Sequence, residues 1–494
     1  MALNLNTAEI QLREHRLASI TAFTGSLAVY AHGTHNCALK KCERCFKQSS
    51  NCLATVALHQ FIRIKNLAVV YHAPAGCAAV ITGEVFRTNW KDAKMSTGYE
   101  KNMQAYTQFV ATDLNEPDTV FGATKKLREL IRHTYETYHP DGIVISTGCV
   151  AGIIGEDVES IAEELSDEIP VPVFSAHCEG FKSNIWANGF DVADHAILQS
   201  IVKAPREKRN VINVRDFHEK GRGPIREALK AIGFETQFFY FGSTLEELSH
   251  LSENAATVCV CGTLGTYIGN ALEQKYGVPY IATASPNGIA GFEEWYREVA
   301  RRLNKSEDAE RYIAEQKALY LPKIEELKKE LRGKTCVVAA GPGFSLELAR
   351  VLEEIGIKVV YTVSWHSDSR FDDDKFPEYI AHAEKSLSSD MTVKISDLQH
   401  HELENVLYRY KPDFFVVRHR AIGSIGYKHG CATLFANNEY VMFGYKNVLK
   451  LAHDLCDLLR NTSFEKNLAQ HVKSPYTDWW HQQNDNKFIV SKTI

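Results

Sequence analysis

Four cysteines of this chain lie where a thiol can do chemistry, at the start of a predicted helix or just beyond a predicted strand. Cys52 opens the run CLATVALHQFIRI, Cys77 follows LAVVYHAPAG, Cys149 follows GIVISTG, and Cys261 ends ATVCVC. In a parallel sheet, ligands bind beyond the carboxyl ends of the strands, so we expect these thiols to lie at a ligand-binding site. Soft thiolates in this arrangement favour iron–sulfur chemistry. For a single thiol such as Cys149, a buried structural cysteine is the competing interpretation.

A second group of thiols lies in the polar segment HNCALKKCERCFKQSSNC, which contains Cys37, Cys42, Cys45 and Cys52. Short, irregular spacing without the paired CxxC knuckles of a zinc ribbon favours an iron–sulfur cluster over zinc. For Cys37, Cys42 and Cys45 two hypotheses stay open. They are either free thiols in a flexible arm or ligands of a further metal site.

The composition, 45% hydrophobic and 24% charged, is typical of a globular protein. The net charge of -5 comes without a basic block, so we expect no nucleic-acid partner. The first residues, MALNLNTAEIQLREHRL, contain no apolar signal core, and no apolar run approaches a membrane span. We therefore expect a cytoplasmic protein without a membrane partner. In that compartment the 12 cysteines favour metal or redox chemistry over disulfides.

The elements that must position these residues alternate between helix and strand. The segments FGATKKLRELIRHTYETY, GIVIST, VESIAEEL and VPVFSAHCEGF follow one another, and similar alternation starts again at Asn210 and at KTCVVAAGPG. Such alternation predicts parallel sheets covered by helices. A length of 494 residues favours about three domains. We therefore predict an α/β fold of three tandem Rossmann-like, doubly wound domains with parallel sheets.

The predicted boundaries follow the changes in this pattern. An N-terminal arm with the Cys-rich segment covers residues 1–50, and its first 36 residues show helical stretches without a core pattern. Domain I (51–209) carries Cys52, Cys77 and Cys149, and domain II (210–330) carries Cys261. Domain III covers 331–460, and a tail covers 461–494. The paired Trp479 and Trp480 of the tail are expected to dock on a neighbouring surface.

Strand ends of the third unit supply further candidates. His366 in VSWHSD and His419 in VVRHR follow predicted strands, so each is a candidate ligand or proton donor, with a structural histidine as the alternative. The segment AAGPGFSLE is similar to a dinucleotide-binding loop but lacks the full GxGxxG pattern and a downstream acid. It is therefore weak support for a nicotinamide cofactor.

From about Cys52 to Leu459 these motifs resemble the nitrogenase component 1 family, and VFSAHCEGF resembles its α-type subunit. The segments HAPAGC and STGCVAGIIGED match its bridging-cluster cysteines, and CGTLGTYIGNALEQKYGVPY matches the segment that anchors its catalytic cofactor. The resemblance implies two metal centres. Cys52, Cys77 and Cys149 would bind a P-cluster type, eight-iron cluster shared with a partner subunit. Cys261 would anchor a large iron–sulfur cofactor, an eight-iron carbide-type cluster whose heterometal and organic acid stay open.

The sequence also departs from that family. Its glutamine and histidine, eight and twelve residues beyond the CEGF cysteine, correspond to Trp186 and Phe190 here. Its second cofactor ligand, a histidine, corresponds to Asn437, and its lysine for the organic acid corresponds to Arg420. Large apolar side chains at 186 and 190 favour an uncharged organic substrate, although both residues are also explained by core packing.

The greatest resemblance is to the D-type subunits of the methylthio-alkane reductases. It implies reductive cleavage of carbon–sulfur bonds in small methyl thioethers, with His366, His419, Trp186 and Phe190 around the reacting centre. It also implies a β-type (K) subunit in an α2β2 heterotetramer and an ATP-dependent iron–sulfur reductase (H) homodimer. Two alternatives stay open, a scaffold for nitrogenase cofactor assembly and a vanadium or iron-only nitrogenase α subunit. Tetrapyrrole reductases share the fold but have no cofactor-anchoring cysteine.

Overall fold

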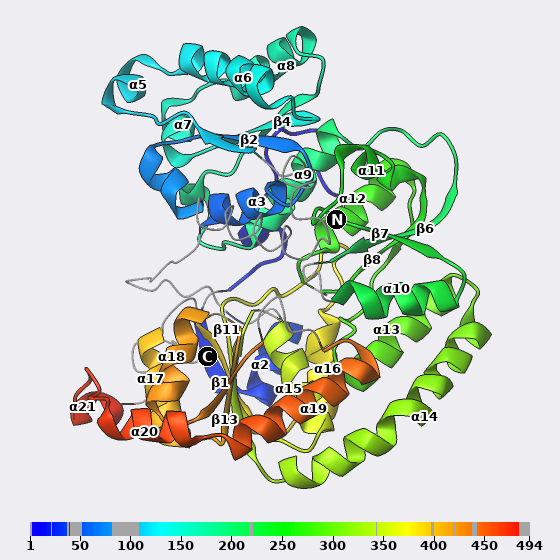
Figure 1. Cartoon of the computed structure of the whole chain (residues 1–494), viewed down its shortest axis with the longest axis vertical. Coiled ribbons are helices and arrows are strands. Elements are labelled where there is room, and N and C mark those ends of the chain that lie inside the picture. The colour runs from blue at the N-terminus through cyan, green and yellow to red at the C-terminus, as the bar shows by residue number, and fades with distance from the viewer. Residues whose placement is uncertain are drawn as a thin grey trace.

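Three sheets form the framework of the protein (Figure 1). The computed structural model describes residues 2–20, 22–36, 39, 52–81, 108–216, 221–261, 263–341, 343–396, 400–418, 420–436 and 442–483. In Figure 1 the first sheet lies at the top, the second at the right and the third at the bottom. Cys37, Cys42, Cys45, His419 and Asn437 lie outside the described residues.

The first sheet has the order β3-β2-β4-β5, with all neighbours parallel. Its strands are β2 (Leu67–His72), β3 (Gln108–Ala111), β4 (Gly142–Thr147) and β5 (Val173–Ala176). Every residue of β4 is buried, as expected for a parallel strand covered on both faces. One face packs on α3 (Leu53–Phe61) and α9 (Asn188–Ser200), and the other on α6 (Thr124–Tyr138) and α8 (Val158–Glu168).

The second sheet has the order β7-β6-β8-β9 and is also parallel. Its strands are β6 (Arg209–Arg215), β7 (Glu235–Phe238), β8 (Asn254–Cys259) and β9 (Tyr280–Ile281). Helix α12 (Thr266–Tyr276) shares a hydrophobic core with α3 and α9 of the first unit. On the other face α10 (Arg222–Ala231) and α13 (Gly288–Arg302) pack in a separate core. The first two units are therefore joined by continuous apolar packing.

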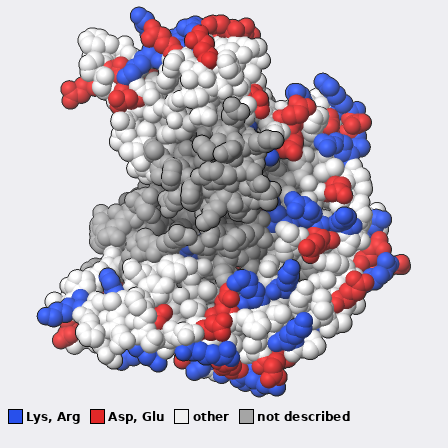
Figure 2. Space-filling view, viewed as in Figure 1, with Lys and Arg blue, Asp and Glu red and all other residues white. Residues whose placement is uncertain are grey.

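Helix α14 (Ser306–Leu331) runs from the second unit to the third along the outer edge of the molecule (Figure 1). Figure 2 shows basic and acidic side chains interleaved over this edge, so neither sign of charge dominates it. Of the helices that the structure describes, none is long and apolar enough to cross a membrane.

The third sheet has the order β1-β12-β11-β10-β13-β14. Four of its neighbouring pairs are parallel, and β1 (Ala22–Ser26) pairs antiparallel with β12 (Thr392–Ser396). The remaining strands are β10 (Thr335–Ala340), β11 (Lys358–Ser364), β13 (Phe414–Val417) and β14 (Ala432–Phe435). The helices packed around this sheet are α15 (Phe344–Glu354), α16 (Glu378–Ser386), α17 (His400–Tyr410), α18 (Arg420–Lys428) and α19 (Gly444–Arg460). The predicted α/β class with parallel sheets is confirmed.

The N-terminal segment differs from the arm without a core pattern that the sequence predicted. Strand β1 extends the third sheet, and α2 (Leu27–His35) buries Leu27, Tyr30 and Ala31 in the core of that sheet. The segment shows no core pattern of its own, because the apolar side chains of α2 pack on residues that come almost 300 or more positions later.

The tail docks on the third unit, as its paired tryptophans predicted. Helix α20 (Ser463–His471) packs on α18, and α21 (Asp478–His481) packs on α17. The Asn405 amide donates a 2.9 Å hydrogen bond to the carbonyl of Trp480, and the rings of Tyr408 and His481 stack at 4.2 Å.

Candidate functional site

Three of the predicted cysteine ligands come together at one edge of the first sheet. Cys52 is the N-cap residue of α3, Cys77 lies in the helical residues 75–81 that follow β2, and Cys149 begins α7 (Cys149–Ile154). A Cβ atom placed on Gly180 would lie 3.3 Å from the Cys52 Sγ and 3.6 Å from the Cys149 Sγ. Burial raises the pKa of Cys77, and the charges of Cys149 and Cys52 raise it further, which places Cys77 beside the other two thiols.

Two glycines of this site allow a close approach of neighbouring atoms. Gly148 precedes Cys149, and a Cβ there would lie 2.7 Å from the Ala73 Cβ and 3.1 Å from the His72 carbonyl. The backbone before Cys149 can therefore pack directly on the end of β2. At Gly180 the Cys52 and Cys149 sulfur atoms approach to within 3.6 Å of the place that a Cβ would take. Several soft donors that converge in this way are suited to an iron–sulfur cluster.

A layer of polar contacts holds the segments that carry the thiols. The ring of His72 contacts Thr112 Oγ1 at 3.1 Å and Glu156 through its other nitrogen, and burial chiefly lowers its pKa. Glu156, which directly precedes the N-cap residue of α8, binds His72 and the amide of Ala123. Asp157 caps α8 by accepting the amide of Ser160 at 3.0 Å.

Cys178 and Glu179 lie behind the three thiols. Cys178 is buried and its pKa is raised well above the ordinary value, first by burial and then by the charge of Glu179. Burial alone would raise the pKa of Glu179, but hydrogen bonds from His177 and Lys182 lower it to about 2. Thr147 Oγ1 also donates to Glu179 at 2.9 Å. Glu179 therefore stays charged and fixes the loop that leads to Gly180.

Exposed apolar side chains surround the thiol edge. Cys52 and Cys77 are themselves exposed and Cys149 is half-buried. Ile153 in α7 is 72% exposed, Phe181 beside Gly180 is 56% exposed, and Val80 beside Cys77 is 59% exposed. Val120 and Phe121 continue this surface on α5 (Glu116–Phe121), which packs on α7. We call these five residues the thiol-edge patch. Apolar groups gathered around exposed thiols are typical of a surface that another chain covers.

The fourth predicted ligand, Cys261, lies apart from these three and between the sheets. It follows β8, is half-buried, and its Sγ lies 3.4 Å from Thr263 Oγ1. Trp186 and Phe190 pack with it on the core of the second unit. Their rings are 6.2 Å apart, and the Trp186 ring meets the His366 ring edge-on at 6.3 Å. Ring contacts thus join Trp186 to Phe190 and to His366, and Cys261 packs against the same core as the two aromatic residues.

His366 projects from the end of β11 in the third unit. It is 2% exposed, and its Nε2 has no hydrogen-bond partner among the residues that the structure describes. The nearest carboxylate oxygen, on Asp368, is 3.8 Å from this nitrogen. Burial lowers the pKa of His366, so the ring is neutral at pH 7. A neutral imidazole with a free ring nitrogen can bind a metal or a polar ligand.

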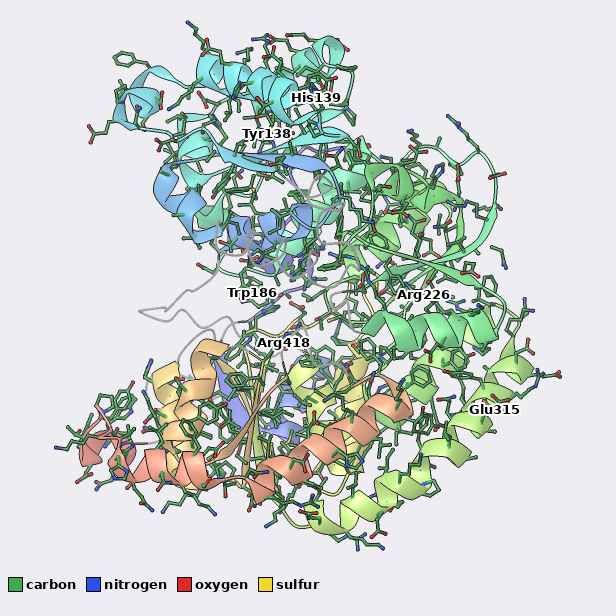
Figure 3. The ribbon with its side chains drawn as sticks, in the orientation of Figure 1. Tyr138, His139, Trp186, Arg226, Glu315 and Arg418 are labelled. Atoms are coloured by element: carbon green, nitrogen blue, oxygen red, sulfur yellow. The ribbon has the colours of Figure 1, made fainter. Side chains whose placement is uncertain are left out.

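Arg418 is a site residue that the sequence did not single out. It follows β13, and its guanidinium lies 4.8 Å from the centre of the Phe344 ring. Burial lowers the pKa of Arg418 to about 10, and the charge of Cys261 partly offsets this effect, so the two side chains are close. Figure 3 shows Trp186 and Arg418 in the centre of the molecule, between the upper and lower units. The strand-end rule that selected His366 would also have selected Arg418.

The remaining predicted residues are not tested by this arrangement. Arg420 begins α18, but the structure does not describe its side chain. His419 and Asn437 lie outside the described residues. Within the described ranges, no three His, Cys, Asp or Glu side chains are set to hold a single metal ion. Four of the described cysteines form two candidate sites, one with Cys52, Cys77 and Cys149 at the surface and one with the half-buried Cys261.

Known proteins of one family are similar to this chain. The family described as nitrogenase component 1 type oxidoreductase matches residues 52–460. The nitrogenase molybdenum-iron protein alpha chain of Methanosarcina barkeri is 28% identical over 402 residues, covering 71% of this chain and 74% of its own. The nitrogenase iron-molybdenum cofactor biosynthesis protein NifE of the same organism is 29% identical over 392 residues, covering 75% and 79%. The solved structure "Nitrogenase Cp1 at pH 5" shares the fold, with a TM-score of 0.70 at 22% identity over 89% of this chain and 94% of that one.

Proposed function

Because the chain belongs to the nitrogenase component 1 family of oxidoreductases, we propose that it is the catalytic α-type subunit of a reductase that cleaves C–S bonds of small methyl thioethers. This is the activity of the methylthio-alkane reductases. The observation that carries the proposal is the aromatic pair Trp186 and Phe190, which packs against the same hydrophobic core as the half-buried Cys261. These walls suit a small uncharged molecule better than a polar one.

The three-cysteine site is proposed to hold half of an eight-iron P-cluster type centre. Cys52, Cys77 and Cys149 would supply thiolates, and the missing side chain of Gly180 lets two of the sulfur atoms converge. The other half would come from a β-type subunit that covers the thiol-edge patch. An α2β2 heterotetramer would bury two such surfaces. An ATP-dependent iron–sulfur reductase protein would deliver electrons to this centre.

The Cys261 site is proposed to hold the larger iron–sulfur cofactor. Its donor set fits such a group, because it offers a thiol, a neutral imidazole with a free Nε2, and a guanidinium that can neutralise an anionic cluster. When bound there, the cofactor supplies the electrons that break the C–S bond. Cys261 would anchor it, His366 Nε2 would contact it from the third unit, and Arg418 would balance its charge.

The protein side chains position the substrate and exclude water. For dimethyl sulfide the balanced reaction takes up two electrons and two protons and yields methane and methanethiol. Trp186 and Phe190 would surround the two methyl groups, and their bulk leaves little room for water beside the sulfur. Because His366 is neutral at pH 7, it serves as a polar contact rather than as a store of protons.

The experiment is turnover by the assembled complex. The purified heterotetramer is mixed with its reductase protein, ATP, a reductant and dimethyl sulfide, and methanethiol and methane are measured by gas chromatography. We expect equal amounts of both products, and none without ATP or with Cys261→Ala. A complex that carries both clusters yet forms no methanethiol would contradict the proposal.

A second candidate function is a scaffold on which a nitrogenase cofactor is assembled. The similarity to NifE, equal in extent to the similarity to the molybdenum-iron alpha chain, favours it. A scaffold would transfer its cofactor to a cofactor-free nitrogenase and would not turn over a thioether. Transfer without turnover would therefore establish this alternative in place of the reductase.

A further inference from the structure

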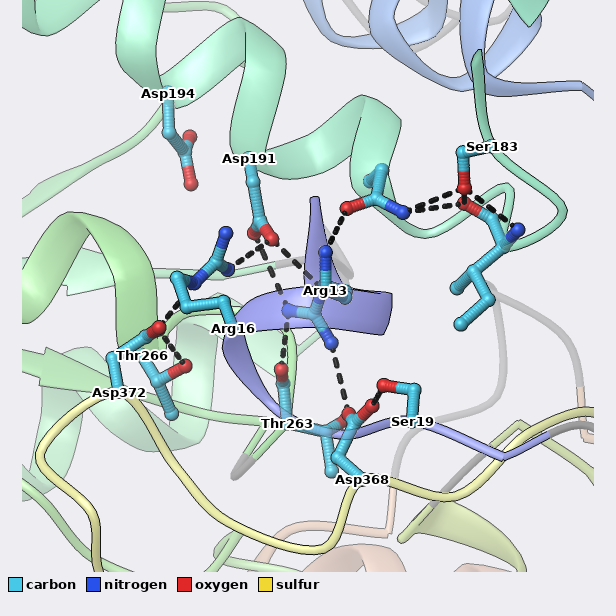
Figure 4. A network of polar contacts seen from close by, with 12 residues as sticks. Arg13, Arg16, Ser19, Ser183, Asp191, Asp194, Thr263, Thr266, Asp368 and Asp372 are labelled. Atoms are coloured by element: carbon cyan, nitrogen blue, oxygen red, sulfur yellow. Dashed lines mark hydrogen bonds and ion pairs between the residues drawn. The ribbon is translucent and has the colours of Figure 1, made fainter. Parts of the chain in front are cut away.

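Arg13, in the N-terminal segment, is among the most deeply buried side chains of the described protein. It begins α1 (Arg13–Arg16) and is 0% exposed. Its guanidinium donates to Asp191 at 2.8 Å, to Asp368 at 3.0 Å and to the carbonyl of Thr263 at 2.6 Å (Figure 4). These three acceptors belong to three different units of the fold. One side chain thus bridges all three.

Each acceptor lies, along the chain, within two residues of a residue of the Cys261 site. Asp191 directly follows Phe190, Thr263 comes two residues after Cys261, and Asp368 comes two residues after His366. The carbonyl of Thr263 and the two carboxylates would otherwise face one another across the junction. A planar guanidinium presents its N–H groups in fixed directions, so it can set the relative positions of three acceptors.

Arg16 and the backbone of Arg13 make further contacts around the Arg13 guanidinium. Arg16 donates to Asp191 at 2.7 Å and also binds Asp372, which accepts the Thr266 hydroxyl at 2.8 Å. The amide of Arg13 donates to the Asn188 side chain at 2.7 Å, which fixes the segment on α9. Although burial alone would lower the pKa of Arg13, the Asp191 and Asp368 carboxylates raise it overall. The arginine is therefore charged at every pH at which the protein folds.

We propose that Arg13 is a positioning residue of the Cys261 site, which holds the loops after β8 and β11 and the start of α9 in the arrangement that receives the cofactor. This inference rests on the proposed function only for the identity of the bound group. The N-terminal segment is then part of the site, although no residue of it touches Cys261 in the contacts described above. Loss of the guanidinium would leave Asp368 without its arginine partner and Asp191 with Arg16 alone, so the two loops and the start of α9 would separate.

The first test uses cofactor-free protein and hydrogen–deuterium exchange. We expect Arg13→Gln to speed amide exchange in residues 263–266 and 368–372 by at least about tenfold, while Arg13→Lys restores part of the protection. The matched control is Lys394→Met, which removes another buried cation, paired with Glu402 at 2.9 Å on the third sheet. It should leave exchange in those two loops unchanged. Equal exchange in the Arg13→Gln variant and the wild type would overturn the proposal.

If Arg13→Gln does not fold, a milder variant still tests the proposal. Asp368→Asn removes one charge and keeps the shape, so faster exchange should be confined to the loop after β11. Faster exchange throughout the third sheet would show a general structural role and would also overturn the proposal.

The second test measures the metal in the assembled complex. Arg13→Gln should lower the spectroscopic signal of the cofactor while the signal of the interface cluster stays, and Lys394→Met should preserve both. Equal losses of both signals in Arg13→Gln would contradict a positioning role. If the wild type itself carries no cofactor, the proposed function fails, whereas the exchange experiment still decides the role of Arg13.

Discussion

Gly180 gives the most local test of the three-cysteine site, because its missing side chain leaves the space between two thiols. A Cβ there would lie 3.1 Å from the Cys52 Cβ, 3.3 Å from the Cys52 Sγ and 3.6 Å from the Cys149 Sγ. The first two distances are shorter than the roughly 3.5–4.0 Å at which such atoms attract each other. Gly180 is not among the glycines with positive φ, so alanine suits its backbone and the perturbation is confined to the added methyl group.

The size of the effect depends on whether the thiols are free to move. In the cluster-free chain Cys52 can turn away, since its thiol is exposed, and Gly180→Ala should fold normally. A cluster bound to both thiolates fixes their positions, so the methyl group becomes an overpacked contact that costs about 1–3 kcal/mol. That loss corresponds to cluster binding weakened by about 5- to 150-fold.

The assay measures the amounts of iron and acid-labile sulfide per complex. Thermal unfolding of the cluster-free chain tests whether each variant folds. The matched control is Gly223→Ala in α10, where an added Cβ has no heavy atom within 4 Å. We expect Gly180→Ala to lose the interface cluster and Gly223→Ala to keep it. A Gly180→Ala complex with the full iron content of the wild type would refute the convergence of Cys52 and Cys149 on one cluster.

Three further predictions concern other parts of the site. Cys261→Ala should keep the fold and the interface cluster but lose the cofactor iron, which elemental analysis measures. Cys149→Ala should instead weaken subunit association, which gel filtration measures. Equal iron content in the wild type and in Cys261→Ala would contradict the assignment of Cys261. Arg418→Met should weaken cofactor binding by about 10- to 150-fold, because a charge-assisted contact contributes about 1.5–3 kcal/mol, and Arg418→Lys should weaken it less. Unchanged cofactor binding in Arg418→Met would exclude charge balance by this residue. The pKa of Glu179 falls from 4.5 to about 2 on folding, so its charge stabilises the native state above pH 4.5 and this contribution is lost as the pH falls toward 2. Urea unfolding of Glu179→Gln should therefore show a loss of up to about 3 kcal/mol at pH 7 that shrinks below pH 4.5, and a pH-independent difference would contradict it.

Much of the fold follows from local patterns of the sequence. The run GIVIST predicted β4 because a strand covered on both faces is apolar throughout. The segment TYIGNALEQKYG, with its C-terminal glycine, predicted α12, whose cap residue Gly277 has a φ of 68°. Because Cys149 and Cys261 were placed at the ends of predicted strands, their positions could be predicted before the structure was known.

The parts that the sequence did not predict depend on distant partners. Arg13 belongs to a polar stretch, and its burial follows only from acceptors 178, 250 and 355 residues away. Strand β1 joins a sheet whose other strands come after residue 330, so no local sequence pattern predicts this pairing. The segment after β13 carries both Arg418 and His419, and the histidine has the more familiar metal-binding chemistry. In each case tertiary contacts, rather than local propensity, determine the role of the residue.

The most direct test of two separate metal centres is an anomalous-scattering map of the assembled complex at the iron absorption edge. We predict two separate regions of iron for each copy of this chain. One should be bounded by Cys52, Cys77 and Cys149 and lie against the partner subunit, and the other should be attached to Cys261 between Trp186 and Arg418. Iron at only one of these positions, or iron bound elsewhere while these cysteines carry none, would contradict the account.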